Sequence, residues 1–130
     1  MATYVDDMYL HSMGRYGRMK MSHLIADTDE ELHAMAAKIG VDEKWWQAPP
    51  HSSHYDIAMT KRAAAIANGA IPITLRQCSS MNFRRKATGQ LGKPEDAEAW
   101  HRDWLAARRA ALAEKSKEVQ AAFDRPIETK

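Results

Sequence analysis

The sequence contains a single cysteine, Cys78, among its 130 residues. One cysteine supports neither an internal disulfide framework nor a paired-cysteine zinc site, so we exclude both. No apolar run approaches the roughly 18 residues that a membrane span requires. The N-terminus also lacks the basic and then apolar order of a signal peptide. We therefore expect a cytoplasmic protein that makes no use of a membrane.

Acidic residues are missing from two long stretches of the chain. No aspartate or glutamate lies between Asp7 and Asp27, and none lies between Asp56 and Glu95. The net charge of +2 is too small to establish a nucleic-acid partner. The two acid-free stretches are nevertheless rich in lysine and arginine, and they can create a local positive field.

The composition is that of one globular domain, with 45% hydrophobic and 28% charged residues. The clearest predicted element is a helix that begins after Thr28. Thr28 and Glu31 match the capping box, and apolar residues follow at the spacing of one helix face. Gly40 then suits the left-handed position that ends a helix. We expect this helix to bury one apolar stripe.

We predict an α/β fold in which a small sheet of about three strands carries two packed helices, followed by a long C-terminal helix. The expected strands cover residues 3–6, 22–26 and 71–75, and the expected second helix covers residues 60–68. The expected units are a compact domain (1–75), a basic linker (76–93), an amphipathic helix (94–124) and a tail (125–130).

The predicted C-terminal helix carries a narrow apolar seam. Leu105, Leu112 and Val119 recur every seven residues, and Trp100 and Trp104 are one helical turn apart. This seam has two interpretations that the residues leave open. It packs against its own domain, or it joins two copies of the chain in a homo-oligomer.

The first 75 residues contain an ordered set of short motifs. These are Tyr-Val-Asp-Asp-Met (4–8), Gly-Arg-Met-Lys-Met-Ser-His-Leu-Ile-Ala-Asp (17–27), Glu-Leu-His-Ala-Met-Ala (31–36), Ile-Gly-Val (39–41), Trp46, His-Tyr-Asp-Ile (54–57), Lys61 and Arg62. Together they resemble a small bacterial and phage family, catalogued as domain of unknown function 4031. The resemblance covers residues 3–75 and implies a compact α/β domain, with no established activity. For a phage-encoded member, the expected location is the host cytoplasm. Residues around His11 and the Pro49-Pro50 pair depart from the family pattern.

The first candidate site is a cluster of aspartates and histidines. Asp6, Asp7 and Asp56 are candidate ligands of a divalent cation, and a carboxylate-rich set favours Mg²⁺ or Mn²⁺. His23 or His54 would then serve as a further ligand or as a base, and the ion would activate a water molecule. The alternative is structural, with the aspartates capping turns and the histidines bonded to the backbone.

The same residues also suit general acid–base catalysis without a metal. In this interpretation His54 and His23 are the catalytic groups, together with Asp56. In an extended strand His54 and Asp56 share a face, whereas Tyr55 points to the other face. The competing interpretation is a histidine that is hydrogen-bonded within the core.

The second candidate site is a phosphate-binding surface. Arg15 and Arg18 lie in a glycine-containing loop with Tyr16, which is able to stack on a base. Lys61 and Arg62 fall in the first turn of the predicted second helix, where an anion is favoured. The alternative is a solvated charged surface.

The leading hypothesis is a phosphate-recognising protein that acts on nucleic acid or nucleotides, with metal-assisted phosphoester hydrolysis as its candidate chemistry. The alternative is a non-catalytic phage or bacterial interaction protein that binds a host protein or a small signal molecule. The sequence leaves open whether the chain is an enzyme, because nothing in it shows that the aspartates and histidines converge in space.

Overall fold

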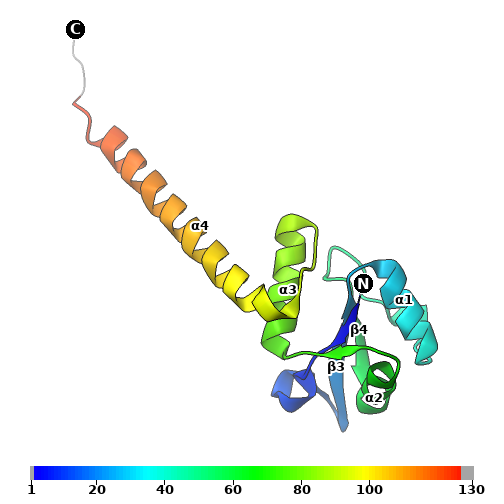
Figure 1. The fold of residues 1–130 in the computed structure, drawn as a ribbon. Coiled ribbons are helices and arrows are strands. Elements are labelled where there is room, and N and C mark those ends of the chain that lie inside the picture. The colour runs from blue at the N-terminus through cyan, green and yellow to red at the C-terminus, as the bar shows by residue number, and fades with distance from the viewer. Residues whose placement is uncertain (1, 127–130) are drawn as a thin grey trace.

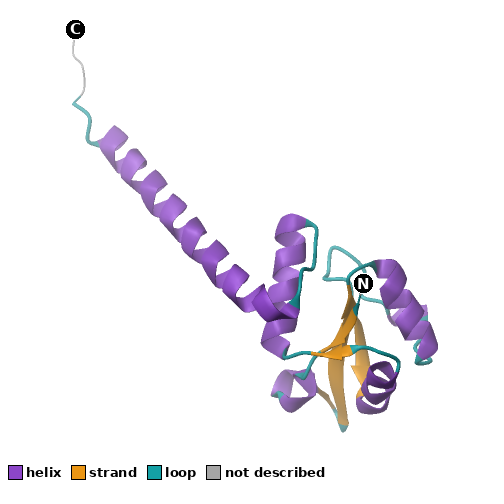
Figure 2. Cartoon of the chain, viewed as in Figure 1, coloured by secondary structure: helices purple, strands orange, loops and turns teal. Residues whose placement is uncertain are grey.

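The computed structural model describes residues 2–126, and it confirms the predicted α/β class. A mixed sheet of five strands lies at the centre, rather than a sheet of about three. The two additional strands cover residues 15–16 and 55–58, and both are too short for a clear periodic signal. The strand predicted over residues 71–75 is confined to residues 71–72, because residue 75 already begins a helix. The strands, shown in orange in Figure 2, are β1 (Thr3–Val5), β2 (Arg15–Tyr16), β3 (Met19–Ala26), β4 (Tyr55–Ala58) and β5 (Ile71–Pro72).

The longest strand, β3, organises the sheet. It pairs antiparallel with β1, β2 and β4, and β5 adds to β1 as a parallel edge strand. An edge position suits β5 because Pro72 has no amide hydrogen for a further ladder. Among the described strands β4 pairs with β3 alone, so its outer edge carries no further strand there.

Helices cover both faces of the sheet (Figure 1). Helices α1 and α2 lie on one face, and α3 and the start of α4 lie on the other. The rest of α4 extends away from the sheet. No helix within residues 2–126 is long and apolar enough to cross a membrane. The α-helices are α1 (Asp29–Lys38), α2 (Met59–Ala67), α3 (Leu75–Thr88) and α4 (Pro94–Phe123); the short 3-10 helices are η1 (Met8–Leu10), η2 (Ser12–Gly14) and η3 (Glu43–Trp45).

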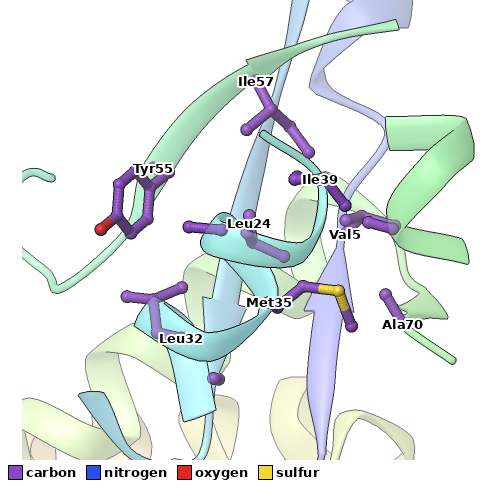
Figure 3. Close-up of a cluster of buried hydrophobic side chains, with 11 residues drawn as sticks. Val5, Leu24, Leu32, Met35, Ile39, Tyr55, Ile57 and Ala70 are labelled. Carbon is purple, nitrogen blue, oxygen red and sulfur yellow. The ribbon is translucent and has the colours of Figure 1, made fainter. Parts of the chain in front are cut away.

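The two sheet faces carry two separate apolar clusters. Leu24 packs with Tyr55 and Leu32 under α1, as Figure 3 shows. Its neighbour Ile25 points to the opposite face and packs with Met81 of α3. Both β3 side chains are completely buried, which confirms that this strand is covered on both faces.

Helix α1 forms as its capping residues predict. The Thr28 hydroxyl oxygen accepts a hydrogen bond from the Glu31 amide at 3.2 Å, and the same hydroxyl donates to the Glu31 carboxylate at 3.0 Å. Gly40 adopts a φ of 77°, and the amide of Val41 bonds back to the carbonyl of Ala36 at 2.8 Å. This is the glycine-terminated helix end that the sequence indicates.

The prediction of a basic linker over residues 76–93 is wrong for most of that segment. Residues 75–88 form α3, which starts with a complete capping box between Thr74 and Gln77. Cys78 and Met81 bury one side of this helix, whereas its basic residues face outward or bond to the sheet. The small polar residues between Cys78 and Met81 interrupt the apolar spacing that would otherwise indicate a helix. The predicted helix over 94–124 is confirmed as α4, and residues 127–130 of the predicted tail lie outside the described residues.

Candidate metal centre

Three polar side chains form a row across the sheet face that α3 covers. Asp6 follows β1, and its amide bonds to the carbonyl of His23 at 3.1 Å. His23 of β3 is in turn the register partner of Asp56 on β4. Because strand residues alternate between faces, Leu24 and Tyr55 point into the opposite cluster. Pairing of the strands therefore places Asp6, His23 and Asp56 side by side.

Asp6 is a completely buried carboxylate that orients His23. Its Oδ1 accepts hydrogen bonds from the amides of Met8 at 3.1 Å and His23 at 2.8 Å, and its Oδ2 lies 2.6 Å from His23 Nδ1. Burial raises the pKa of Asp6, but the bonds from His23 and Met8 outweigh burial and lower this pKa below its usual range. The ionised carboxylate only accepts, so Nδ1 of His23 carries the hydrogen.

His54 is oriented in the same manner by the backbone. Its Nδ1 donates to the carbonyl oxygen of Ser52, and its Nε2 lies 3.4 Å from Oδ1 of Asp56. Burial lowers the pKa of His54, but the bond to Asp56, the Ser52 carbonyl and nearby negative charge raise it overall. The bond to His54 lowers the pKa of Asp56, although partial burial opposes this effect. Asp56 is therefore ionised at neutral pH.

The two imidazoles direct their remaining nitrogens at the same carboxylate. His23 Nε2 lies 3.7 Å from Asp56 Oδ1, and the three potential ligand atoms lie within 4.8 Å of one another. The two rings meet edge to face, with centroids 5.0 Å apart, so they do not stack. Two ligands of one tetrahedral zinc ion lie about 3.4 Å apart. His23, His54 and Asp56 thus have the chemistry and spacing to hold one divalent ion.

The cluster opens to solvent through a cleft between α3 and the segment that precedes β4 (residues 51–54), here called the α3 cleft. Its volume is about 420 Å³. Asp56 is the most exposed member of the cluster, with 42% of its side chain accessible, whereas the Asp6 side chain is inaccessible. The Asp6 carboxylate therefore supports the site from the protein interior, whereas the Asp56 carboxylate is in contact with solvent. The lining of the cleft includes His23, His51, His54, Cys78, Asn82 and Lys86.

Cys78 of α3 completes the buried side of the site, and no sequence spacing indicates this position. Its thiol lies within 4.8 Å of the polar atoms of Asp6 and His23. Burial, together with the charge of Asp6 and a hydrogen bond to it, raises the pKa of Cys78 well above its usual value. The thiol is consequently protonated at neutral pH and is a poor nucleophile.

Asp7 lies apart from this cluster, although it neighbours Asp6 in sequence. Its Oδ1 accepts a hydrogen bond from the amide of Leu75 at 2.6 Å, at the start of α3. His11 Nε2 is 3.9 Å from the same oxygen. Asp7 thereby ties the segment after β1 to α3, and the structure does not bring it to the other predicted ligands.

The four predicted phosphate-binding residues occupy two places. Arg15 lies in β2 and Arg18 in the following turn, so the segment predicted as a loop includes a short hairpin; both side chains are exposed. Lys61 and Arg62 lie in the first turn of α2, but the side chain of each bonds to backbone. Lys61 Nζ donates to the carbonyl of Ile39 at 2.8 Å, and Arg62 Nε donates to the carbonyl of Asp6 at 2.9 Å. Arg62 therefore supports the segment that carries Asp6.

The fold and this cluster together define a three-layer α/β domain with a carboxylate–histidine centre on one sheet face. The chain belongs to the family described as "Protein of unknown function (DUF4031)", which matches residues 3–85. The match extends beyond the expected residue 75, includes every residue of the cluster and most of α3, and ends before α4. No curated protein and no solved structure matches the chain.

Proposed function

We propose that this protein binds one divalent metal ion through His23, His54 and Asp56 and uses it to hydrolyse a phosphoester. One observation supports this proposal above the others. The Nδ1 atom of each histidine is engaged by an acceptor, Asp6 in one case and Ser52 in the other. When the rings are neutral, both Nε2 lone pairs face the Asp56 carboxylate. Such outer hydrogen bonds are the usual support of metal-bound histidines.

The ligand set also favours certain ions. Two imidazoles and one carboxylate suit Zn²⁺ or Mn²⁺ better than Mg²⁺, which prefers oxygen ligands. We therefore retain Mn²⁺ from the two expected ions and add Zn²⁺. Asp6 takes the role of a positioning residue, because both of its oxygens already serve His23 and the backbone.

Three protein ligands leave coordination positions for a water molecule and for a substrate oxygen. A bound divalent ion would polarise a phosphoryl oxygen and lower the pKa of the water. Asn82 and Lys86 of α3 line the same cleft as His54 and offer a donor and a positive charge to a phosphate. The proposal places this activity in the cytoplasm, as the sequence predicts.

Hydrolysis of bis-(p-nitrophenyl) phosphate tests this proposal. Protein stripped with a chelator is assayed alone and after addition of Mn²⁺, Zn²⁺ or Mg²⁺. We expect turnover only with added metal and a loss in Asp56→Asn that exceeds the roughly 10- to 100-fold cost of an outer hydrogen bond. Asp103→Asn on the exposed part of α4 is the matched control and keeps full activity. Absence of turnover with every ion, or equal turnover in Asp56→Asn, would overturn the proposal.

The second candidate function, interaction through α4, is supported by the exposure of that helix. Trp100 and Trp104 pack on Phe83 of their own chain, with ring centroids 6.3 and 5.0 Å from it. From residue 105 to residue 123 every side chain is exposed, including Leu112 at 55%. The tryptophans are therefore internal anchors, and the remaining seam is available to a partner.

We propose a second copy of the chain as that partner, since a seven-residue repeat on one helix is complementary to the same repeat on another. Sedimentation of the full chain tests this. We expect a dimer that dissociates in Leu112→Glu and persists in Glu114→Gln, a control at an exposed position outside the seven-residue series. A wild-type monomer at all concentrations would contradict self-association and leave α4 for a different protein.

A further inference from the structure

A large groove joins the β2–β3 hairpin to η3. Its volume is about 810 Å³, and we call it the Tyr16–Trp45 groove after its two exposed aromatic side chains. Asp56, a proposed metal ligand, lines this groove as well. The groove therefore reaches the proposed metal centre at Asp56, whereas the α3 cleft reaches it at His23 and His54.

The aromatic side chains of the groove are unusually exposed. Tyr16 is 80% accessible and Trp45 is 61% accessible, whereas neighbouring Trp46 is held by a hydrogen bond from its Nε1 to Ser53 at 2.9 Å. Met13 and Met19 are also more than half exposed beside Tyr16. These four exposed side chains therefore present apolar surface to solvent and contribute little to the core of their own chain.

Positive charges accompany these aromatic faces. Arg15 and Lys44 each neighbour an aromatic side chain in sequence, and Lys61 lines the same groove. Lys44 Nζ lies 5.4 Å from the centroid of the Trp45 ring. The hairpin also lies in the acid-free stretch, and it adds the exposed cations Arg18 and Lys20. The groove therefore has a basic and aromatic lining that includes two acidic residues, Asp42 and Asp56.

This combination fits one class of occupant better than others. An apolar peptide or a lipid tail would make no favourable contact with the cations, and a small phosphate would leave the two exposed rings uncovered. A duplex keeps its bases stacked on one another. Single-stranded nucleic acid has both free base faces and a phosphate at each step, and proteins bind it with aromatic rings beside cations.

We infer that the Tyr16–Trp45 groove binds a single strand of nucleic acid, with bases stacked on Tyr16 and Trp45 and backbone phosphates near Arg15, Lys44 and Lys61. A strand in this position passes Asp56, so its phosphodiester would reach the proposed metal centre. The inference rests on the proposed function for that last step, and it names the substrate class of the same site.

Fluorescence anisotropy with a labelled oligothymidylate in the presence of a chelator tests the binding step without any metal chemistry. We expect saturable binding by the full chain that weakens about 5- to 150-fold in each of Tyr16→Ala and Trp45→Ala, the range for loss of one stacked base. Phe123→Ala is the control, because this ring is 87% exposed at the far end of α4. Binding should also weaken steeply between about 50 and 200 mM salt.

The outcomes separate this inference from the proposed hydrolysis. Weaker binding of a duplex of the same sequence supports the single-strand assignment, and equal or tighter duplex binding overturns it. Loss of binding to the same extent in Phe123→Ala, or no binding at low salt, also overturns it. Hydrolysis of the small phosphodiester with no oligonucleotide binding would retain the metal centre and reject the groove. Oligonucleotide binding without metal-dependent turnover would retain the groove and reject the metal centre.

Discussion

Asp6 determines both the backbone and the ring position of His23. One carboxylate oxygen accepts the His23 amide at 2.8 Å, and the other lies 2.6 Å from Nδ1 of the same residue. The two residues are 17 positions apart, and pairing of β1 with β3 brings them together. This double contact sets the tautomer of His23, which leaves its Nε2 as the atom that faces Asp56.

The substitution Asp6→Asn should reduce metal affinity without removing any metal ligand. If the asparagine carbonyl oxygen keeps accepting from the two backbone amides, its NH₂ group faces His23. Nδ1 of His23 must then accept a hydrogen bond from that NH₂ group. The hydrogen moves to Nε2, which can no longer bind an ion. We expect about a 10- to 100-fold loss of affinity, measured by competition with a chelator. Unchanged affinity in a folded Asp6→Asn protein would show that this contact does not prepare the site.

Stability at acid pH should also depend on Asp6. Its pKa is lowered in the folded state, so the folded protein binds this proton more weakly than the unfolded chain does. The stabilisation from this carboxylate is complete above the unfolded-state pKa of about 3.9, and it disappears as the pH falls through the lower folded-state pKa. Urea unfolding from about pH 6 to about pH 2, which covers the titration range of a carboxyl group, measures this effect. The free energy of unfolding should fall more steeply with decreasing pH in wild type than in Asp6→Asn. Parallel curves would contradict the assignment.

The Cys78 thiol should resist thiol reagents while the protein is folded. It is buried, and the raised pKa keeps it protonated at pH values where a free cysteine begins to ionise. We expect very slow reaction with a disulfide reagent at neutral pH and rapid reaction of one thiol in denaturant. Rapid labelling of the native protein would mean that α3 opens readily from the sheet.

Gly14→Ala should destabilise the segment before the hairpin. A Cβ atom at this position would lie 2.6 Å from the carbonyl carbon of Met8 and even closer to its oxygen, so the backbone must shift. We expect a loss of about 3 kcal/mol in unfolding free energy, at the upper end of overpacking effects. Gly17→Ala is the comparison: its φ of 62° disfavours alanine, but no atom lies within 4 Å, so it should lose only about 1 kcal/mol. Equal losses would show that contact with Met8 does not restrain this segment.

The sequence predicts those elements whose signals are local. Thr28, Glu31 and Gly40 each act within a few residues, and α1 follows from them. Leu24 and Ile25 indicate a strand covered on both faces, and the structure confirms it. The sequence does not predict α3, because only one turn of its apolar side is evident, although the Thr74–Gln77 capping box is a usable signal.

The candidate site depends on strand pairing, which no local pattern specifies. His54 and Asp56 share a face because they are two residues apart in an extended segment. His23 joins them only through the register of β3 with β4, and Cys78 only through packing of α3. Asp6 and Asp7 are adjacent in sequence but serve different parts of the fold, because Asp6 bonds to His23 of β3 and Asp7 bonds to the amide at the start of α3.

Titration of chelator-treated protein with Co²⁺, followed by visible absorption, tests the metal centre most directly. We expect visible bands that saturate at one ion per chain, because imidazole and carboxylate ligands change the spectrum of the hydrated ion. The bands should disappear in His54→Gln and in Asp56→Asn, and they should remain in Asp103→Asn. A wild-type protein that shows no saturable bands, or variants that bind Co²⁺ as well as wild type does, would contradict a metal site at His23, His54 and Asp56.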